Sequence, residues 1–324
     1  MGGGLWPWLT LAGLLGVLFA LDLVVFQRGG EREISVRRAA TLSAFWLVVA
    51  LAFTGVVWAQ KGGPAAGEYV AGYLIERSLS VDNVFVFAIL MTAFAVPSAL
   101  QMRLLFWGVA MAIVMRAGFI AAGAALLDAA HWVLYLFGAF LLATAIKLLR
   151  HQGTEVHPER NPIVRLVGRA VPSVGEFHGT RVFIRQAGRR MATPMLAALV
   201  AVATTDLIFA LDSIPAIFAI TRDSYIVFAA NAFAVLGLVP LYFLLAGGIS
   251  RFAHLDTGLA LVLAFVGLKM LLTDLWHIPI WLSLAIILGV IAVTMLTSLR
   301  SERRQSRPAE TNRSERSENA HGSA

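Results

Sequence analysis

Long apolar runs separated by short polar segments dominate the chain. Nine of these runs are predicted to be helices, at residues 5–26, 39–60, 69–95, 101–127, 130–150, 193–221, 224–248, 255–275 and 279–299. Most of them reach the length of about 20 residues that spans the hydrocarbon core of a bilayer as an α-helix. Because lipid offers no hydrogen-bond partner to backbone groups, such runs have to be helical. The pattern therefore predicts an all-α fold, a polytopic bundle of about nine transmembrane helices.

Two segments depart from this apolar pattern. The loop 151–192 is rich in Gly, Pro, Arg and His, and we expect it to be poorly ordered or to hold a short surface helix. The tail 300–324 consists mostly of Ser, Arg and Glu without apolar periodicity, which predicts a disordered cytoplasmic tail. The chain is thus expected to be one transmembrane domain, residues 1–299, followed by that tail.

Composition and charge agree with a membrane protein. The chain is 59% hydrophobic and only 14% charged, whereas soluble domains are nearer half apolar and a quarter charged. The net charge of +7 does not indicate a nucleic-acid partner, because the basic residues lie at helix ends, in one loop and in the tail.

One set of alternate loops holds Arg28, Arg32, Arg37, Arg38, Arg103, Arg251 and the basic 151–192 loop; the opposite set holds Lys61 and Arg222. By the positive-inside rule this predicts an inner (plasma) membrane protein with its N-terminus outside and its C-terminus in the cytoplasm.

The chain also contains an internal repeat. Two segments each carry an acid, a second acid six residues later, a small polar residue next to it, and a lysine two helices further on. The matched residues are Glu76, Asp82, Asn83 and Lys147 in the first segment and Asp206, Asp212, Ser213 and Lys269 in the second. We interpret residues 69–150 and 193–275 as two three-helix repeats. Since three is odd, the repeats are inverted relative to each other, an arrangement typical of transporters with a site near the bilayer midplane.

The acids inside the predicted helices carry the functional argument. A charged side chain at membrane depth costs at least about 2.5–3.5 kcal/mol on insertion scales, so four carboxylates require cations, protons or each other. The chain has no cysteine and no histidine in the two acidic segments, and hard oxygen donors suit Mn²⁺, Mg²⁺ or Ca²⁺. The predicted metal ligands are Glu76, Asp82, Asn83, Asp206, Asp212 and Ser213. The divalent ion would be cargo, and no resident cofactor is expected.

Three geometric expectations follow from these helices. In an antiparallel pair, equal spacing would bring Glu76 level with Asp212, and Asp82 level with Asp206. Pro215 lacks an N–H and should break its helix, freeing a carbonyl beside Asp212. The basic residues Arg116, Lys147 and Lys269 are candidates for charge pairing or coupling, and Arg77 adjoins Glu76 and can neutralise it. Carboxylates left over after binding one divalent ion would suit proton-coupled exchange.

The acidic segments resemble those of the TerC family of integral membrane proteins, which includes manganese exporters of the Alx type and tellurium-resistance proteins. The matching residues are Glu76, Ser80-Val-Asp82-Asn83, the segment from Asp206 to Pro215, the segment from Asn231 to Leu238, and Gly267-Leu-Lys269. The likeness covers about residues 36–299 and implies manganese efflux with the four acids as metal-binding residues. The family often has an arginine after the Leu-Gly-Leu stretch, where this chain has Val239-Pro240.

Other classes of function stay open at this point. The buried acids could be interhelical hydrogen-bonding groups of a non-transporting scaffold or assembly factor, or the site of a Ca²⁺/cation–proton exchanger of similar architecture. An enzyme is not expected, because the sequence holds no nucleophile elbow, zinc-protease motif or phosphate loop. A scaffold would tolerate Asp to Asn changes better than an ion site would. The expected partners are a divalent metal ion, protons and the lipid bilayer, and no residue links the chain directly to tellurium.

Overall fold

The computed structural model describes residues 5–27, 35–130, 132–150, 175–186, 189–245, 255–276, 278–294 and 296–297. The predicted tail 300–324, most of the 151–192 loop, and Arg28, Arg32 and Arg251 lie outside the described residues. The side chain of Asp82 also lies outside them, although its backbone belongs to a helix. Within the described ranges the fold is a helical bundle, as predicted.

Helical segments lie in each of the nine predicted ranges. They are α1 (Leu5–Gln27), α2 (Val36–Lys61), α3 (Gly63–Ala93), α4 (Ser98–Ala129), α5 (Val133–Arg150), α7 (Pro194–Phe218), α8 (Ser224–Leu236), α9 (Leu238–Leu245), α10 (Leu255–Leu271) and a last helix over Ile280–Thr294. Two starts are fixed by side-chain caps. The Ser35 hydroxyl accepts from the Arg38 amide at the start of α2, and the Asp223 carboxylate accepts from the Tyr225 amide at the start of α8.

Five of the described helices are long and apolar enough to cross a membrane on their own: α1, α2, α4, α5 and α7. The pair α8 and α9, bent by 41°, makes a sixth candidate. Helix α3 is long enough but carries four charged residues, and α10 and the last helix are shorter. The protein is therefore a multi-pass membrane bundle, and nine crossings stay a prediction.

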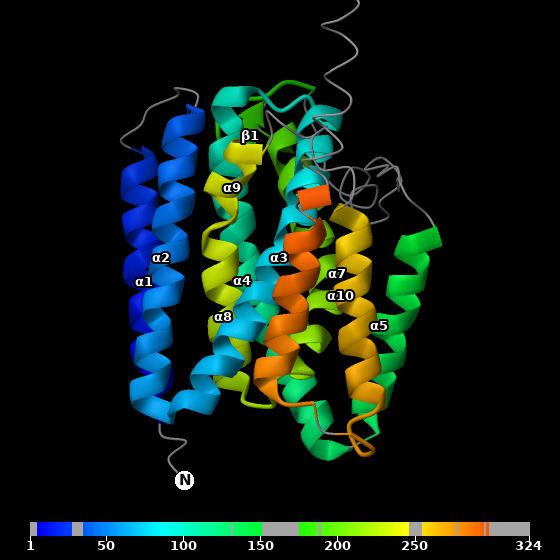
Figure 1. Ribbon diagram of the computed structural model, residues 1–324. Coiled ribbons are helices and arrows are strands. Elements are labelled where there is room, and N and C mark those ends of the chain that lie inside the picture. The colour runs from blue at the N-terminus through cyan, green and yellow to red at the C-terminus, as the bar shows by residue number, and fades with distance from the viewer. Residues whose placement is uncertain are drawn as a thin grey trace, which may run out of the picture.

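The helices run alternately up and down through the bundle (Figure 1). Helices α1 and α2 lie at one side, α5 and α10 at the other, and α3, α4, α7 and α8 between them. Each helix of the first half packs against its counterpart in the second half: α3 against α7, α4 against α8, and α5 against α10. The cross contacts also match, because α3 packs on α8 as α4 packs on α7. This pairing is the one expected of two related three-helix halves, although the inverted repeat itself stays a prediction.

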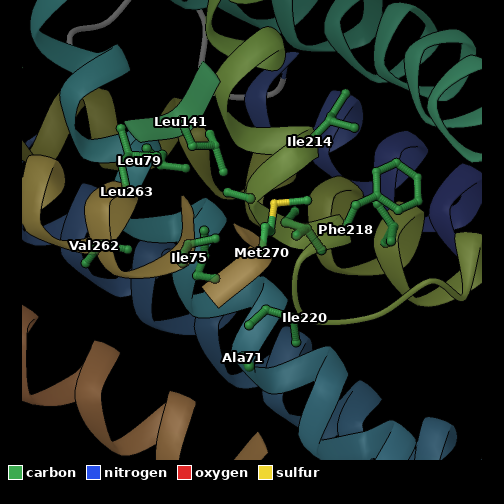
Figure 2. Packing of buried hydrophobic residues seen from close by; sticks show 14 of the residues in the cluster. Ala71, Ile75, Leu79, Leu141, Ile214, Phe218, Ile220, Val262, Leu263 and Met270 are labelled. Carbon is green, nitrogen blue, oxygen red and sulfur yellow. The ribbon is translucent and has the colours of Figure 1, made fainter. Parts of the chain in front are cut away.

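Buried apolar side chains hold the two halves together. In the cluster of Figure 2, Ile75 and Leu79 of α3 lie among Leu141 of α5, Ile214 of α7 and Met270 of α10. Close approach of α5 and α10 needs glycine on both helices, Gly138 and Gly267. A Cβ atom on Gly138 would lie 2.9 Å from the carbonyl oxygen of Gly267, and one on Gly267 would lie 2.8 Å from that of Gly138. Small residues at such contacts let membrane helices pack tightly.

The loop before α7 contains a β-hairpin. Strand β1 (Phe183–Gln186) pairs antiparallel with β2 (Arg189–Ala192), with Phe183 opposite Ala192. The Thr193 hydroxyl, just before α7, donates to the carbonyl of Arg181 at 2.6 Å and ties the hairpin to the helix start. The expectation of disorder or a surface helix is therefore wrong for this part of the loop, where Val182, Phe183 and Ile184 are three consecutive strand formers.

The helix break lies at Gly237, close to Pro240, and not at Pro215 as predicted. Helix α7 continues through Pro215 to Phe218, so the break expected at Pro215 is not observed. The bend falls instead at Gly237, between α8 and α9. Pro240 explains it, because its ring has no N–H for the carbonyl of Leu236, whereas the first turn of a new helix tolerates proline.

Candidate functional site: a buried arginine between two carboxylates

Arg116 lies in the middle of α4 and is 1% exposed. Apolar residues of α4 surround it in sequence, so its guanidinium has no route to water along its own helix. A guanidinium remains charged in proteins and offers five N–H donors in a fixed planar fork. Its burial therefore requires acceptors from neighbouring helices.

Asp206 of α7 is the main partner of this guanidinium. The Arg116 Nε donates to Asp206 Oδ2 at 3.0 Å, and Nη2 donates to Oδ1 at 2.9 Å. This is the bidentate geometry in which arginine binds a carboxylate most strongly. Asp206 is itself 1% exposed, so both charges of the pair are withdrawn from solvent.

The third nitrogen, Nη1 of Arg116, joins two further helices. It donates to Glu76 Oε1 of α3 in a second ion pair and to Asn231 Oδ1 of α8 at 3.2 Å. Both acceptors are buried. Each of the four central helices thus contributes one side chain, and the two acids come from the two predicted repeats.

The charges of this cluster do not cancel. With both carboxylates ionised, Glu76 and Asp206 bring two negative charges and Arg116 brings one positive charge. A residual negative charge in a water-poor interior is costly unless a cation or a proton compensates it. With both acids ionised, the cluster therefore needs one more positive charge, which either a cation or a proton can supply.

Four polar atoms on α3, α7 and α8 are buried and have no hydrogen-bond partner within the described part of the chain. They are Glu76 Oε2, Ser80 Oγ, Ser213 Oγ and Asn231 Nδ2. Ser80 follows Glu76 by one helical turn, and Ser213 follows Asp206 by seven residues, so each shares a face of its helix with the acid. Native interiors leave few such groups, and three of these four are oxygens of the kind that hard cations prefer.

The family model for the integral membrane protein TerC family matches residues 61–306. This chain belongs to the TerC family. It is 43% identical to "Uncharacterized membrane protein STKORF319" of Myxococcus xanthus over 289 residues, which cover 89% of this chain and 90% of that protein. It is 41% identical to "Putative membrane-bound redox modulator Alx" of Escherichia coli K12 over 295 residues, 89% of this chain and 92% of that protein. No solved structure matches the chain.

In this TerC family member the predicted site residues fall into separate places. Glu76 lies level with Asp206 through the shared guanidinium, so the expected pairing of Glu76 with Asp212 is wrong. The Asp212 Oδ1 atom instead accepts from Thr144 Oγ1 of α5 at 3.1 Å, with Lys147 near enough to interact electrostatically. The reason is geometric: α3 and α7 meet at the guanidinium of α4, which fixes their relative height.

Of the remaining predicted ligands, Asn83 is buried in α3 and Ser213 in α7. Over the ranges that the structure describes, no three Asp, Glu or His side chains converge as a ready-made metal site. Assignment of the six predicted ligands to a metal therefore stays a prediction.

The other basic candidates lie away from the guanidinium cluster. Lys269 of α10 is 9% exposed and donates to Ser283 Oγ of the last helix at 3.1 Å, with Glu68 near enough to interact electrostatically. Lys147 is exposed near the end of α5. Arg77 points to the break between α8 and α9, donating to the Ala234 carbonyl at 3.3 Å, while Glu76 takes its ion pair from Arg116.

Proposed function

We propose that this TerC family protein is a divalent-cation transporter, that its cargo is Mn²⁺ moved by efflux, and that the cation binds the carboxylates of Glu76 and Asp206. The observation that carries the proposal is the joint burial of these two acids from opposite halves of the bundle around one guanidinium. A transporter that alternates access needs a site between halves that move relative to each other.

Ligand chemistry supports a hard divalent cation. Carboxylate, hydroxyl and amide oxygens suit Mn²⁺, Mg²⁺ and Ca²⁺, and manganese is the member of this set that the resemblance to manganese exporters favours. Coupling to protons follows from the same residues. Acids that lose their metal in a buried site have to take up protons or a guanidinium in its place.

The proposed location is the inner membrane, with the N-terminus outside. The described hairpin and the starts of α2 and α4, which carry Arg37, Arg38 and Arg103, share one end of the bundle (Figure 1). Lys61 pairs with Asp223 at the helix ends of the opposite side. The arginine-rich end would face the cytoplasm under the positive-inside rule.

A redox role, which the name of the Alx relatives mentions, gains no support from the residues of this chain. The sequence contains no cysteine, so none of its side chains carries thiol chemistry. A scaffold role would need the buried acids only as interhelical contacts. It is therefore kept as the outcome that a failed transport experiment would favour.

The test of this proposal is manganese content in cells that lack their own exporter. Wild type, Glu76→Gln and Asp206→Asn would be compared at matched membrane expression after Mn²⁺ loading, with Arg103→Gln as a control at an exposed site. We expect wild type and the control to lower cell manganese and both acid variants to fail. Equal export by wild type and the acid variants would overturn the proposal, as would no export by wild type.

A further inference from the structure

We infer that Arg116 is a built-in counter-cation of the site: its guanidinium offsets one of the two negative charges of Glu76 and Asp206 between transport events and leaves these acids before a divalent cation binds. Asn231 is the positioning residue that holds the guanidinium in its neutralising place. This inference rests on the proposed transport function and adds to it a residue that sets affinity and release.

The hydrogen bonds of Arg116 show that the guanidinium already uses three of the four carboxylate oxygens of Asp206 and Glu76. Both oxygens of Asp206 already accept from it, at 3.0 and 2.9 Å, and Oε1 of Glu76 accepts from Nη1. A metal ion approaching these same oxygens would meet a fixed positive charge at hydrogen-bond distance. Like charges repel strongly in a poorly solvated site.

Charge balance leads to the same conclusion. With the guanidinium in place, a divalent cation would convert a net charge of one negative into one positive within a fully buried cluster. If the guanidinium moves out of contact with the acids, the two carboxylates and the divalent cation neutralise each other, and the guanidinium needs other acceptors within the bundle because α4 gives it no route to water. Since a buried net charge is costly, the guanidinium and the metal are alternative occupants.

Uncommitted oxygen atoms suggest how a metal would complete its ligand shell. The Oε2 atom of Glu76 and the hydroxyl of Ser80, one turn further along α3, are buried and, within the described ranges, lack hydrogen-bond partners. Once freed from Arg116, the Asp206 carboxylate and Glu76 Oε1 would add to them. A hard divalent ion takes six or more such oxygens, some supplied by water.

The role of Asn231 follows from the hydrogen bonding of the oxygen and nitrogen atoms of its side-chain amide. Its Oδ1 atom accepts from Arg116 Nη1 at 3.2 Å, whereas its Nδ2 atom has no acceptor among the described residues. An amide adds no charge, so it steadies the guanidinium without raising the attraction that the carboxylates already supply. Losing it should make withdrawal of the guanidinium easier.

The experiment measures Mn²⁺ binding to the purified full chain in detergent, followed by the electron paramagnetic resonance signal of free Mn²⁺. The variants are Arg116→Gln, Arg116→Lys and Asn231→Leu, with Arg103→Gln as the same substitution at an exposed site of α4. We expect tenfold or greater tightening of Mn²⁺ binding in Arg116→Gln, a smaller tightening in Asn231→Leu, and wild-type affinity in Arg116→Lys and in the control. Transport by Arg116→Gln should fall, because the metal is no longer displaced.

Because Arg116→Gln is expected to be less stable than wild type when no metal is present, a second measurement is the rise in its melting temperature when Mn²⁺ is added. The rise should be larger in Arg116→Gln than in wild type. Unchanged or weaker binding in folded Arg116→Gln, while Asp206→Asn abolishes the binding seen in wild type, would overturn the counter-cation role alone. Absence of Mn²⁺ binding by wild type and all variants would overturn the proposed function, and this inference with it.

Discussion

The guanidinium of Arg116 and the carboxylate of Asp206 face each other through two hydrogen bonds, of 3.0 and 2.9 Å, at a place where neither side chain is more than 1% exposed. The pair joins α4 of one predicted repeat to α7 of the other. Glu76 binds the same guanidinium and makes the pair a triad. The stability of the bundle and the proposed function therefore depend on the same three charges.

The triad predicts unequal effects of removing its members. Without metal, Arg116→Gln leaves two carboxylates with no counter-charge and should cost about 3–5 kcal/mol of stability. Asp206→Asn leaves a neutral Arg116–Glu76 pair and should cost less. The double variant should regain part of the loss seen in Arg116→Gln. Unfolding in detergent, followed by tryptophan fluorescence, measures this, and strictly additive losses would contradict a shared charge network.

The contact between α5 and α10 predicts a steric effect at two glycines. Gly138→Ala or Gly267→Ala would place a methyl group under 3 Å from a backbone carbonyl oxygen of the facing helix, so the helices must separate. We expect a loss of about 1–3 kcal/mol, the usual cost of overpacking. Gly118→Ala in α4 is the matched control, because its added methyl meets nothing within 4 Å. Equal stability of the three variants would show that α5 and α10 are not closely packed.

The start of α8 predicts that one aspartate has two separable roles. Asp223 pairs with Lys61 at the surface and also caps α8 by accepting from the Tyr225 amide at 3.0 Å. Asp223→Ala should cost about 1 kcal/mol through loss of the cap. Asp223→Asn keeps a capping oxygen, and both it and Lys61→Met should cost well under 1 kcal/mol, as exposed ion pairs do. A larger loss in Lys61→Met than in Asp223→Ala, by thermal unfolding, would reverse this assignment.

The position of Asp212 predicts that it is not equivalent to Asp206. Its Oδ1 atom is bound to Thr144 at the boundary of α5 and α7, away from the guanidinium. We expect Asp212→Asn to retain Mn²⁺ binding and to lower the transport rate, whereas Asp206→Asn loses binding. The two properties are measured separately, by equilibrium binding and by flux. Complete loss of binding in Asp212→Asn would return Asp212 to the same site as Asp206.

Much of the helical architecture could be predicted from the sequence, because apolar length decides where membrane helices form. The importance of Arg116 was also predictable, since an arginine deep in an apolar run has few ways to reach water. Which acids it binds was not predictable. That depends on the relative height of α3 and α7, which equal spacing of the acids along each helix does not determine, so the spacing alone predicts the wrong partner for Glu76.

Two further features of the structure have a signal in the sequence. Asn231 is the one strongly polar residue in the apolar run of α8, and such a residue inside a membrane helix calls for a partner on another helix. The first strand of the hairpin before α7 is indicated by Val182, Phe183 and Ile184, three consecutive strand formers.

The central claim is that the carboxylates around Arg116 carry a divalent cation across the membrane. The most direct measurement is Mn²⁺ flux into sealed vesicles containing the purified protein, followed by quenching of a fluorescent dye trapped inside. We predict rapid quenching with wild type and a rate equal to that of empty vesicles with Asp206→Asn at the same protein density. Wild-type flux no faster than in empty vesicles, or equal flux through Asp206→Asn, would contradict the claim and favour a structural role for the buried acids.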